Sequence, residues 1–141
     1  SSNKISFNLC RKPQVSSTYS PNIEFLKNFP HVERFEILST KTIPVVPIDS
    51  MNIKNPDFMK IDIESHELEM LKGAVETLER CNPIIFIEDP TYFYNQMNSK
   101  ILSDSHKHKN NKKDPTGLDF LCSLGYTVTQ YLGTYNYLAI R

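Results

Sequence analysis

Glycine is scarce in this chain of 141 residues, which holds four glycines, none of them within a G-x-G spacing of another. An average soluble protein of this length would hold about ten. Glycine-rich turns let a backbone approach the phosphates of a nucleotide closely, and they need glycines at short spacing. The sequence therefore predicts no glycine-rich phosphate-binding loop.

An excess of one charge and a long apolar run are also missing. Lysine plus arginine number 16, as do aspartate plus glutamate, so there is no overall basic field of the kind that attracts nucleic acid. The longest apolar stretches, such as residues 84–87, are far shorter than the roughly 18 residues of a membrane-spanning helix. We therefore expect neither nucleic acid nor a membrane as a partner.

Cysteine is present without the spacings that give it a structural use. Cys10, Cys81 and Cys122 lie far apart, and none belongs to a C-x-x-C motif. Their odd number and wide spacing argue against a disulfide framework and against a structural zinc site. We expect reduced thiols and a cytoplasmic location.

The length of the chain suits one domain, and we predict a single domain over residues 1–141. Alternating apolar residues at Ile5, Phe7 and Leu9 predict a strand near the start. This strand belongs to an N-terminal strand and loop segment over residues 1–50, and the core follows over residues 51–141. Because the first residue is serine and not methionine, we expect the start to have been processed or cut from a longer protein.

The best-defined pattern is a strand, a turn and a helix, followed by a second strand. Residues 58–63 form the first strand, and apolar residues at helical spacing from Leu68 to Leu78 predict one helix. Residues 83–88 are almost continuously apolar, which predicts a strand buried on both faces. The right-handed crossover of such a β-α-β unit brings the carboxyl ends of both strands to one sheet edge, where α/β proteins bind ligands.

The remaining segments complete an α/β fold. Residues 98–114 hold five lysines and two aspartates, and we expect a mobile loop there, or a lid over the acidic sheet edge. Residues 118–124 predict a helix, and residues 126–131 and 136–140 predict a terminal antiparallel hairpin. The predicted core is β-α-β-loop-α-β-β, a mostly parallel sheet with helices.

Acidic residues gather where the first strand of the core meets its helix. Asp62, Glu64, His66 and Glu67 lie at this turn, and Glu88 ends the second strand. Asp62 and Glu64 share a face if the strand persists that far, and the carboxylates can then converge on one ligand. Crowded carboxylates raise one another's pKa, and a partly desolvated one can act as a general base toward a hydroxyl. Alternatively, these acids only favour the start of the helix and stay solvated.

Two stretches of this region resemble a known family. They read KIDIESHELEMLKGA over residues 60–74 and PIIFIE over residues 83–88. They resemble the K-I-D-x-E-G-x-E-x-x-x-L-x-G-A and P-x-I-x-x-E signature of the FkbM family of S-adenosylmethionine-dependent methyltransferases, with Ser65 where the family usually has glycine. The resemblance implies the C-terminal part of a Rossmann-like methyltransferase fold. The family's glycine-rich cofactor-binding half has no counterpart in this chain, so no cofactor-binding residue is assigned and weak cofactor binding is expected.

The resemblance also implies roles for individual residues. Asp62 and Glu64 would lie beside the transferred methyl group and the acceptor hydroxyl, and one of them would orient or deprotonate that hydroxyl. Glu67 and Glu88 would support them by holding the acceptor or the backbone amides of the turn. Lys60 can pair with one of these acids. The implied cofactor is S-adenosylmethionine, and the implied acceptor is a sugar or metabolite hydroxyl on a small molecule or a glycan.

Two other functions stay open from the sequence. The chain can be a non-catalytic half-domain that acts as a binding or assembly module. Alternatively, Asp62, Glu64 and His66, together with His106 or His108, can hold a metal ion in a hydrolase, because these residue types suit zinc or manganese.

The strand at residues 58–63 is expected to form an exposed sheet edge, because the strand that would lie beside it is absent. An exposed edge predicts aggregation, a homodimer, association with a missing N-terminal half, or a cover made by residues 1–48.

Overall fold

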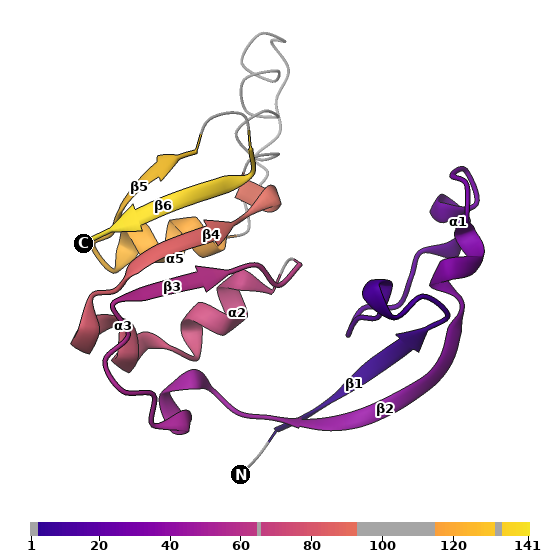
Figure 1. The fold of residues 1–141 in the computed structure, drawn as a ribbon, viewed down its shortest axis with the longest axis horizontal. Coiled ribbons are helices and arrows are strands. Elements are labelled where there is room, and N and C mark those ends of the chain that lie inside the picture. The colour runs from indigo at the N-terminus through magenta and orange to yellow at the C-terminus, as the bar shows by residue number, and fades with distance from the viewer. Residues whose placement is uncertain (1–2, 65, 93–114, 132–133) are drawn as a thin grey trace, which may run out of the picture. The chain divides into compact units, whose positions relative to one another are not determined.

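The computed structural model describes residues 3–64, 66–92, 115–131 and 134–141 (Figure 1). The chain divides into two compact units, Ser1–Val46 and Pro47–Arg141. The boundary lies close to residue 50, where the sequence predicted that the N-terminal segment ends. Compactness alone does not show independent folding, so the single domain stays a prediction.

The first unit is built on an antiparallel pair of strands. These strands, β1 (Asn3–Cys10) and β2 (Ile37–Val45), are paired from Asn3 opposite Val45 to Cys10 opposite Ile37, with a register shift between Leu9 and Cys10. The helical turns between them are η1 (Pro13–Val15), α1 (Ile23–Leu26) and η2 (Val32–Phe35). The strand predicted from the alternation of Ile5, Phe7 and Leu9 is therefore confirmed as β1.

The second unit contains the predicted core. Its elements, in chain order, are η3 (Ile48–Met51), β3 (Phe58–Ile61), α2 (Glu67–Lys72), α3 (Val75–Cys81), β4 (Ile84–Glu88), α5 (Gly117–Ser123), β5 (Thr127–Gln130) and β6 (Asn136–Ile140). The strands expected within residues 58–63, 83–88, 126–131 and 136–140 and the helix expected at 118–124 are present as β3, β4, β5, β6 and α5. Residues 98–114, predicted as a mobile loop or lid, lie outside the described part of the chain.

The four strands of this unit form one mixed sheet in the order β3-β4-β6-β5. β3 and β4 are parallel, as the β-α-β prediction requires, whereas β6 pairs antiparallel with both β4 and β5. The terminal hairpin is confirmed. A mostly parallel sheet is not confirmed, because β6 reverses direction after β5 and it is β6 that lies beside β4.

The single helix expected from Leu68 to Leu78 is divided into α2 and α3. The break falls at Gly73 and Ala74, and Ala74 has a non-helical φ of −124°. A carboxylate far away in the sequence, that of Asp49, binds the amides at the start of α3. Periodicity describes only local spacing, so it could not reveal a break that a distant residue stabilises.

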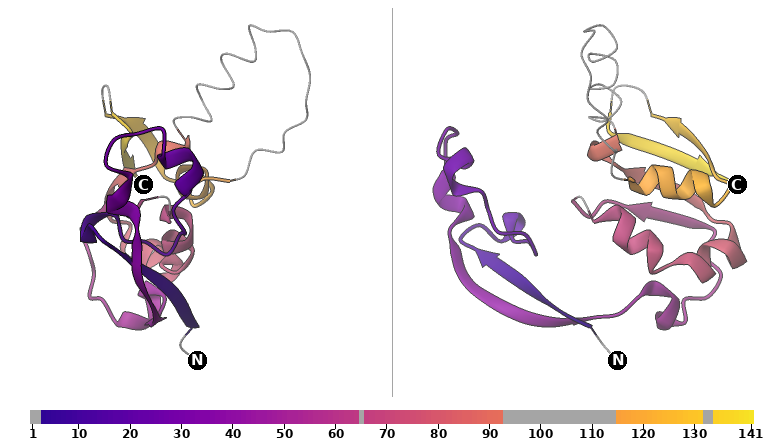
Figure 2. Two further views of the ribbon diagram at one scale, coloured as in Figure 1. Left: turned by 90° about the vertical axis from the view of Figure 1, so that its right-hand side faces the viewer. Right: turned by 180° about the vertical axis from the view of Figure 1, so that it is seen from behind.

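The helices α2, α3 and α5 pack on one face of the four-stranded sheet (Figure 2). The strand side chains that face them are fully buried, namely Ile61, Ile85, Ile87 and Ala139. Alternate side chains point to the opposite face, where Phe58 is 57% exposed and Ile84 is 43% exposed. The prediction that residues 83–88 are buried on both faces is therefore wrong, because the described helices of this unit pack on the first face only.

β3 is the end strand of this sheet. Of the strands that the structure describes, β4 alone pairs with it, and β1 and β2 form a sheet of their own. Among the described strands, β3 therefore has the unpaired edge that the sequence predicted, while a cover of this edge by residues 1–48 stays a prediction. A homodimer or a second half of the protein at this edge stays a prediction.

Candidate active site

Two of the predicted acids lie side by side at the carboxyl edge of the sheet. The parallel register of β3 and β4 ends with Ile61 opposite Ile87. Glu88 is the last residue of β4, and Asp62 directly follows β3. Neighbouring strands lie about 4.8 Å apart, and successive side chains alternate between faces. Because Ile87 faces the helices, Glu88 faces the opposite side, which we call the open face. Asp62 lies just beyond β3, and its carboxylate is bonded to Lys60, a strand residue that points to the open face. The adjacent ends of the two parallel strands thus place the backbones of Asp62 and Glu88 near each other at this edge.

Lys60 holds Asp62 on the open face. Its Nζ donates a hydrogen bond to Asp62 Oδ2 over 2.7 Å, so the predicted pairing of Lys60 with one of the acids is confirmed. The two side chains are 58% and 40% exposed. Exposed ion pairs add little stability because water screens them. The contact therefore orients Asp62 without fixing it rigidly.

Glu64 lies in the turn beyond β3 and not on the strand. β3 ends at Ile61, and Glu64 has a left-handed backbone with a φ of 54°. The expectation that Asp62 and Glu64 share a strand face is therefore wrong, because the strand does not persist to Glu64. A left-handed conformation is costly for a residue with a Cβ atom, by roughly 1 kcal/mol. Ser65, the neighbour that replaces the family's glycine, lies outside the described residues.

Glu67 lies on the helix side and is buried, with 4% of its surface exposed. It begins α2 and packs against the start of α5. A Cβ atom added to Gly117 would lie 3.1 Å from the Glu67 Cβ, so the two backbones approach closely. The interpretation that all of these acids stay solvated is wrong for Glu67, while its supporting role stays a prediction.

Asp89 is a buried acid that the sequence analysis missed. It is 1% exposed, and its carboxylate accepts hydrogen bonds from the amides of Tyr92 at 2.8 Å and Leu118 at 3.3 Å. A signal was present, because Asp89 continues the alternation of Ile85 and Ile87 and so falls on the buried face. A carboxylate at a core position needs partners, and here they are amides at the starts of helices.

The charge of Asp89 is felt by its surroundings. Burial raises the pKa of Tyr137, and the negative charge of Asp89 raises it further, because it disfavours a second anion nearby. The rings of Tyr92 and Tyr137 meet edge to face with their centroids 5.4 Å apart. The pKa of Tyr137 is therefore expected to respond to the charge of the Asp89 carboxylate.

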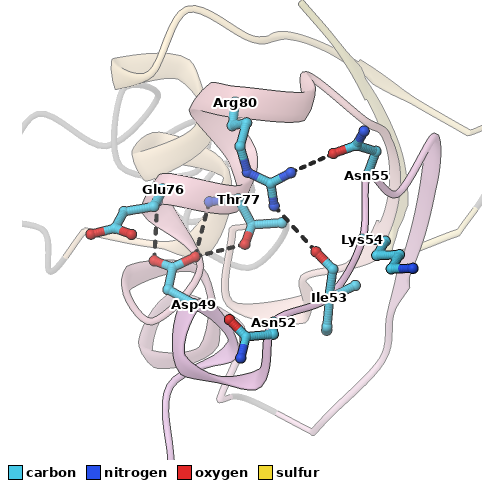
Figure 3. A pocket seen from close by; sticks show the side chains of 8 residues that line it. All are labelled: Asp49, Asn52, Ile53, Lys54, Asn55, Glu76, Thr77 and Arg80. Atoms are coloured by element: carbon cyan, nitrogen blue, oxygen red, sulfur yellow. Dashed lines mark hydrogen bonds between the residues drawn. The ribbon is translucent and has the colours of Figure 1, made fainter.

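A well-formed pocket of about 420 Å³ lies along α3 and not at the carboxyl edge (Figure 3). It is lined by Asp49, Asn52, Ile53, Lys54, Asn55, Glu76, Thr77 and Arg80. Arg80 donates to the Ile53 carbonyl at 3.2 Å and to the Asn55 side chain. Asp49 accepts from the Thr77 hydroxyl at 2.7 Å, the Thr77 amide at 2.9 Å and the Glu76 amide at 3.0 Å.

These hydrogen bonds join the segment before β3 to both ends of α3, and we call this set of contacts the latch. Burial alone would raise the pKa of Asp49, but the Thr77 and Glu76 hydrogen bonds and the positive charge of Arg80 together lower it. The polar groups that line the pocket are thus largely used within the fold. We assign the candidate site to the carboxyl edge for this reason.

The metal-site alternative finds no support in the described residues. Among them, no three or more histidine, cysteine, aspartate or glutamate side chains are placed to hold a metal ion. His106 and His108 lie outside the part of the chain that the structure describes. Cys10, Cys81 and Cys122 are free thiols.

Within the described ranges, no helix has the length and apolar character needed to cross a membrane.

Comparison with known proteins identifies the family. The sequence model of the Methyltransferase FkbM domain matches residues 3–128, which include Asp62, Glu64, Glu67 and Glu88. No curated protein and no solved structure matches the chain. The family match extends over most of the chain and across both compact units. The chain therefore belongs to the FkbM methyltransferase family.

Proposed function

We propose that this chain takes part in S-adenosylmethionine-dependent methylation of a hydroxyl on a sugar or metabolite, and that Asp62 and Glu88 bind the acceptor. The observation that carries the proposal is the position of this carboxylate pair. It follows two parallel strands at their shared carboxyl edge, in a chain that matches the FkbM methyltransferase domain. Ligands of α/β proteins bind at such edges.

The two carboxylates have different roles toward the acceptor. Lys60 binds Asp62 Oδ2, so we assign acceptance of the hydroxyl proton to Oδ1, the oxygen that Lys60 does not bind. Glu88 is half-buried on the neighbouring strand and binds a second hydroxyl of the acceptor. A hydroxyl held in this way is positioned for reaction, and positioning supplies much of the rate in two-substrate transfers. Glu64 supports the pair from the turn, and Glu67 supports it through packing.

The negative charge of the site residues suits the positive charge of the cofactor. S-adenosylmethionine, when bound, supplies an activated methyl group on a positively charged sulfur. The open-face pair of Asp62 and Glu88 suits a positive charge close by. None of the chain's four glycines forms a glycine-rich turn that would hold a nucleotide. We therefore assign no cofactor-binding residue and expect binding by this chain alone to be weak.

Calorimetric titration of S-adenosylmethionine and S-adenosylhomocysteine into the chain tests the proposal. We expect weak saturable binding of S-adenosylmethionine. Asp62→Ala should weaken it by removing a negative charge near the positively charged sulfur, and Glu69→Gln should retain it, because Glu69 is an exposed acid on α2 away from the open face. Absence of binding to the parent chain, or equal loss in both variants, contradicts a catalytic role for the chain as given.

One observation favours a second function, that of a non-catalytic binding module. β3 presents an unpaired edge within the described sheet, and edges of this kind pair with strands of other chains. Absence of cofactor binding combined with a stable complex at this edge would support the module and not the enzyme.

A further inference from the structure

Three segments of the second unit meet at Gly117, where α5 begins. A Cβ atom on Gly117 would lie 3.1 Å from the Glu67 Cβ, 3.3 Å from a methyl of Leu71 and 3.4 Å from Asp89 Oδ2. Such distances leave little room for a methyl group, so glycine permits the close approach. The start of α2, the end of β4 and the start of α5 are thus packed against one another at a single point. We call this point the Gly117 junction.

Asp89 fastens the junction through hydrogen bonds. One carboxylate oxygen, Oδ1, accepts the Tyr92 amide at 2.8 Å, and the other, Oδ2, accepts the Leu118 amide at 3.3 Å. The backbone amide of Asp89 donates to the Tyr135 carbonyl at 2.9 Å, which ties the end of β4 to the segment before β6. These bonds are shielded from water because Asp89 is 1% exposed. The junction is therefore held by directional contacts as well as by packing.

The junction lies next to both carboxylates of the candidate site along the chain. Asp89 directly follows Glu88, and Glu67 lies five residues after Asp62 in the sequence. A displacement at the junction therefore moves the two strand ends that carry Asp62 and Glu88.

We propose that Asp89 and Gly117 are positioning residues, which set the distance and orientation between Asp62 and Glu88 without touching the substrate. The catalytic meaning of this proposal rests on the proposed function. The geometric part stands without it, because the junction fixes the carboxyl edge whatever binds there.

The first test uses two glycines of this chain as a matched pair. Gly73→Ala crowds its site as Gly117→Ala does, because a Cβ atom there would lie 3.2 Å from the Pro47 Cβ. Gly73, however, lies at the break between α2 and α3, away from the carboxyl edge. Amide chemical shifts and residual dipolar couplings of the full chain then report the orientation of the two strand ends. We expect Gly117→Ala to change them at Asp62 and Glu88 and Gly73→Ala to leave them unchanged.

Asp89→Asn is a second variant that keeps nearly the same side-chain volume, in case Gly117→Ala does not fold. The asparagine side chain keeps one oxygen that can accept a hydrogen bond. The backbone amide of either Tyr92 or Leu118 therefore loses its acceptor. We expect the couplings at Asp62 and Glu88 to change here as well. Couplings at both residues that match the parent chain in a folded Asp89→Asn variant overturn the proposal, as does an equal change in Gly73→Ala.

Binding of S-adenosylmethionine, whose positively charged sulfur is expected to respond to the carboxylate pair, separates this proposal from the proposed function. If the parent chain does not bind it but the junction variants shift Asp62 and Glu88, the positioning role stands and the proposed function fails. If the parent chain binds it and the folded junction variants bind equally well with unchanged couplings, the positioning role fails and the proposed function stands. We expect binding at least tenfold weaker in the junction variants and unchanged binding in Gly73→Ala.

Discussion

The two sides of the four-stranded sheet use acidic residues differently. On the helix side, Asp49 accepts hydrogen bonds from two backbone amides near the start of α3. Asp89 accepts them from the amides of Tyr92 and of Leu118, the latter near the start of α5. On the open face, Asp62 is bonded to the exposed side chain of Lys60, and Glu88 lies half-buried beside it. An acid whose oxygens are filled by the backbone stabilises the fold, whereas one held by a flexible lysine is available to a ligand. The number and kind of donors thus separate structural acids from candidate catalytic ones.

The largest effect on stability is expected from Asp89→Ala. This change leaves the amides of Leu118 and Tyr92 without their acceptor in a buried place, which should lower the free energy of unfolding by about 3 kcal/mol. Urea denaturation followed by circular dichroism measures the loss. A loss no larger than that of an exposed acid such as Glu69→Ala would show that Asp89 does not belong with the structural acids.

Asp49→Ala is expected to have the next largest effect. Its carboxylate binds the first amides of α3, and removal of a cap of this kind costs about 1 to 2 kcal/mol of unfolding free energy. Thermal denaturation of Asp49→Ala beside Asp49→Asn provides the measurement, and the asparagine variant should lose less because it keeps an acceptor. Equal and negligible losses would break the latch interpretation.

Asp49 also predicts a dependence of stability on pH. Its pKa is lowered in the folded chain from an ordinary value of 3.8, so the folded state favours the ionised form. The stabilising contribution is complete above pH 3.8 and disappears as the pH falls through the folded-state pKa. Asp49→Asn should therefore lose less stability than the parent chain between pH 5 and pH 2, about the range in which such carboxylates titrate. Parallel losses in the two chains would contradict this assignment.

A spectroscopic change is expected from Asp89→Asn at Tyr137. Burial and the Asp89 charge both raise the Tyr137 pKa above 10.0, so removing the charge should move it back toward that value. Carbon-13 NMR of labelled tyrosine, with Tyr137→Phe to assign the signal, measures this titration. Tyr126, whose pKa is also raised mainly by burial but without a contribution from Asp89, serves as the internal control. A shift of both tyrosines would indicate a general loosening instead of a lost charge.

The smallest effect on stability is expected on the open face. Asp62→Asn and Lys60→Met break an exposed ion pair, so each should change the free energy of unfolding by less than about 0.5 kcal/mol. Cofactor titration on the same samples should nevertheless show weaker binding in Asp62→Asn. A large loss of stability in either variant would place Asp62 among the structural acids and erase the difference between the two sides.

Hydrophobic patterning predicted the elements that depend on local sequence. Alternation at Ile5, Phe7 and Leu9 identified β1, and the apolar runs identified β3 and β4. The right-handed crossover then placed Asp62 and Glu88 at one sheet edge, because parallel strands end on the same side. The candidate site was therefore predictable to the extent that it follows from topology.

The features that the sequence did not predict depend on distant contacts or on backbone detail. The break between α2 and α3 is stabilised by Asp49. The buried carboxylate of Asp89 accepts hydrogen bonds from the amides of Tyr92 and Leu118. The left-handed backbone at Glu64 arises in a turn whose path no periodicity describes. Burial of β4 on one face only reflects which helices pack on the sheet, and the composition of the strand contains no such information.

The two consecutive acids at the end of β4 make the register of this strand decide which acid faces the ligand and which faces the core. Glu88 and Asp89 point to opposite sides because successive strand residues alternate. A deletion or insertion of one residue within β4 would exchange them, sending the ligand-facing acid into the core and the amide-binding acid to the surface. The length of β4 is thus constrained twice, once by packing and once by the order of two neighbouring acids. A one-residue slip should damage the protein more than substitution of either acid alone.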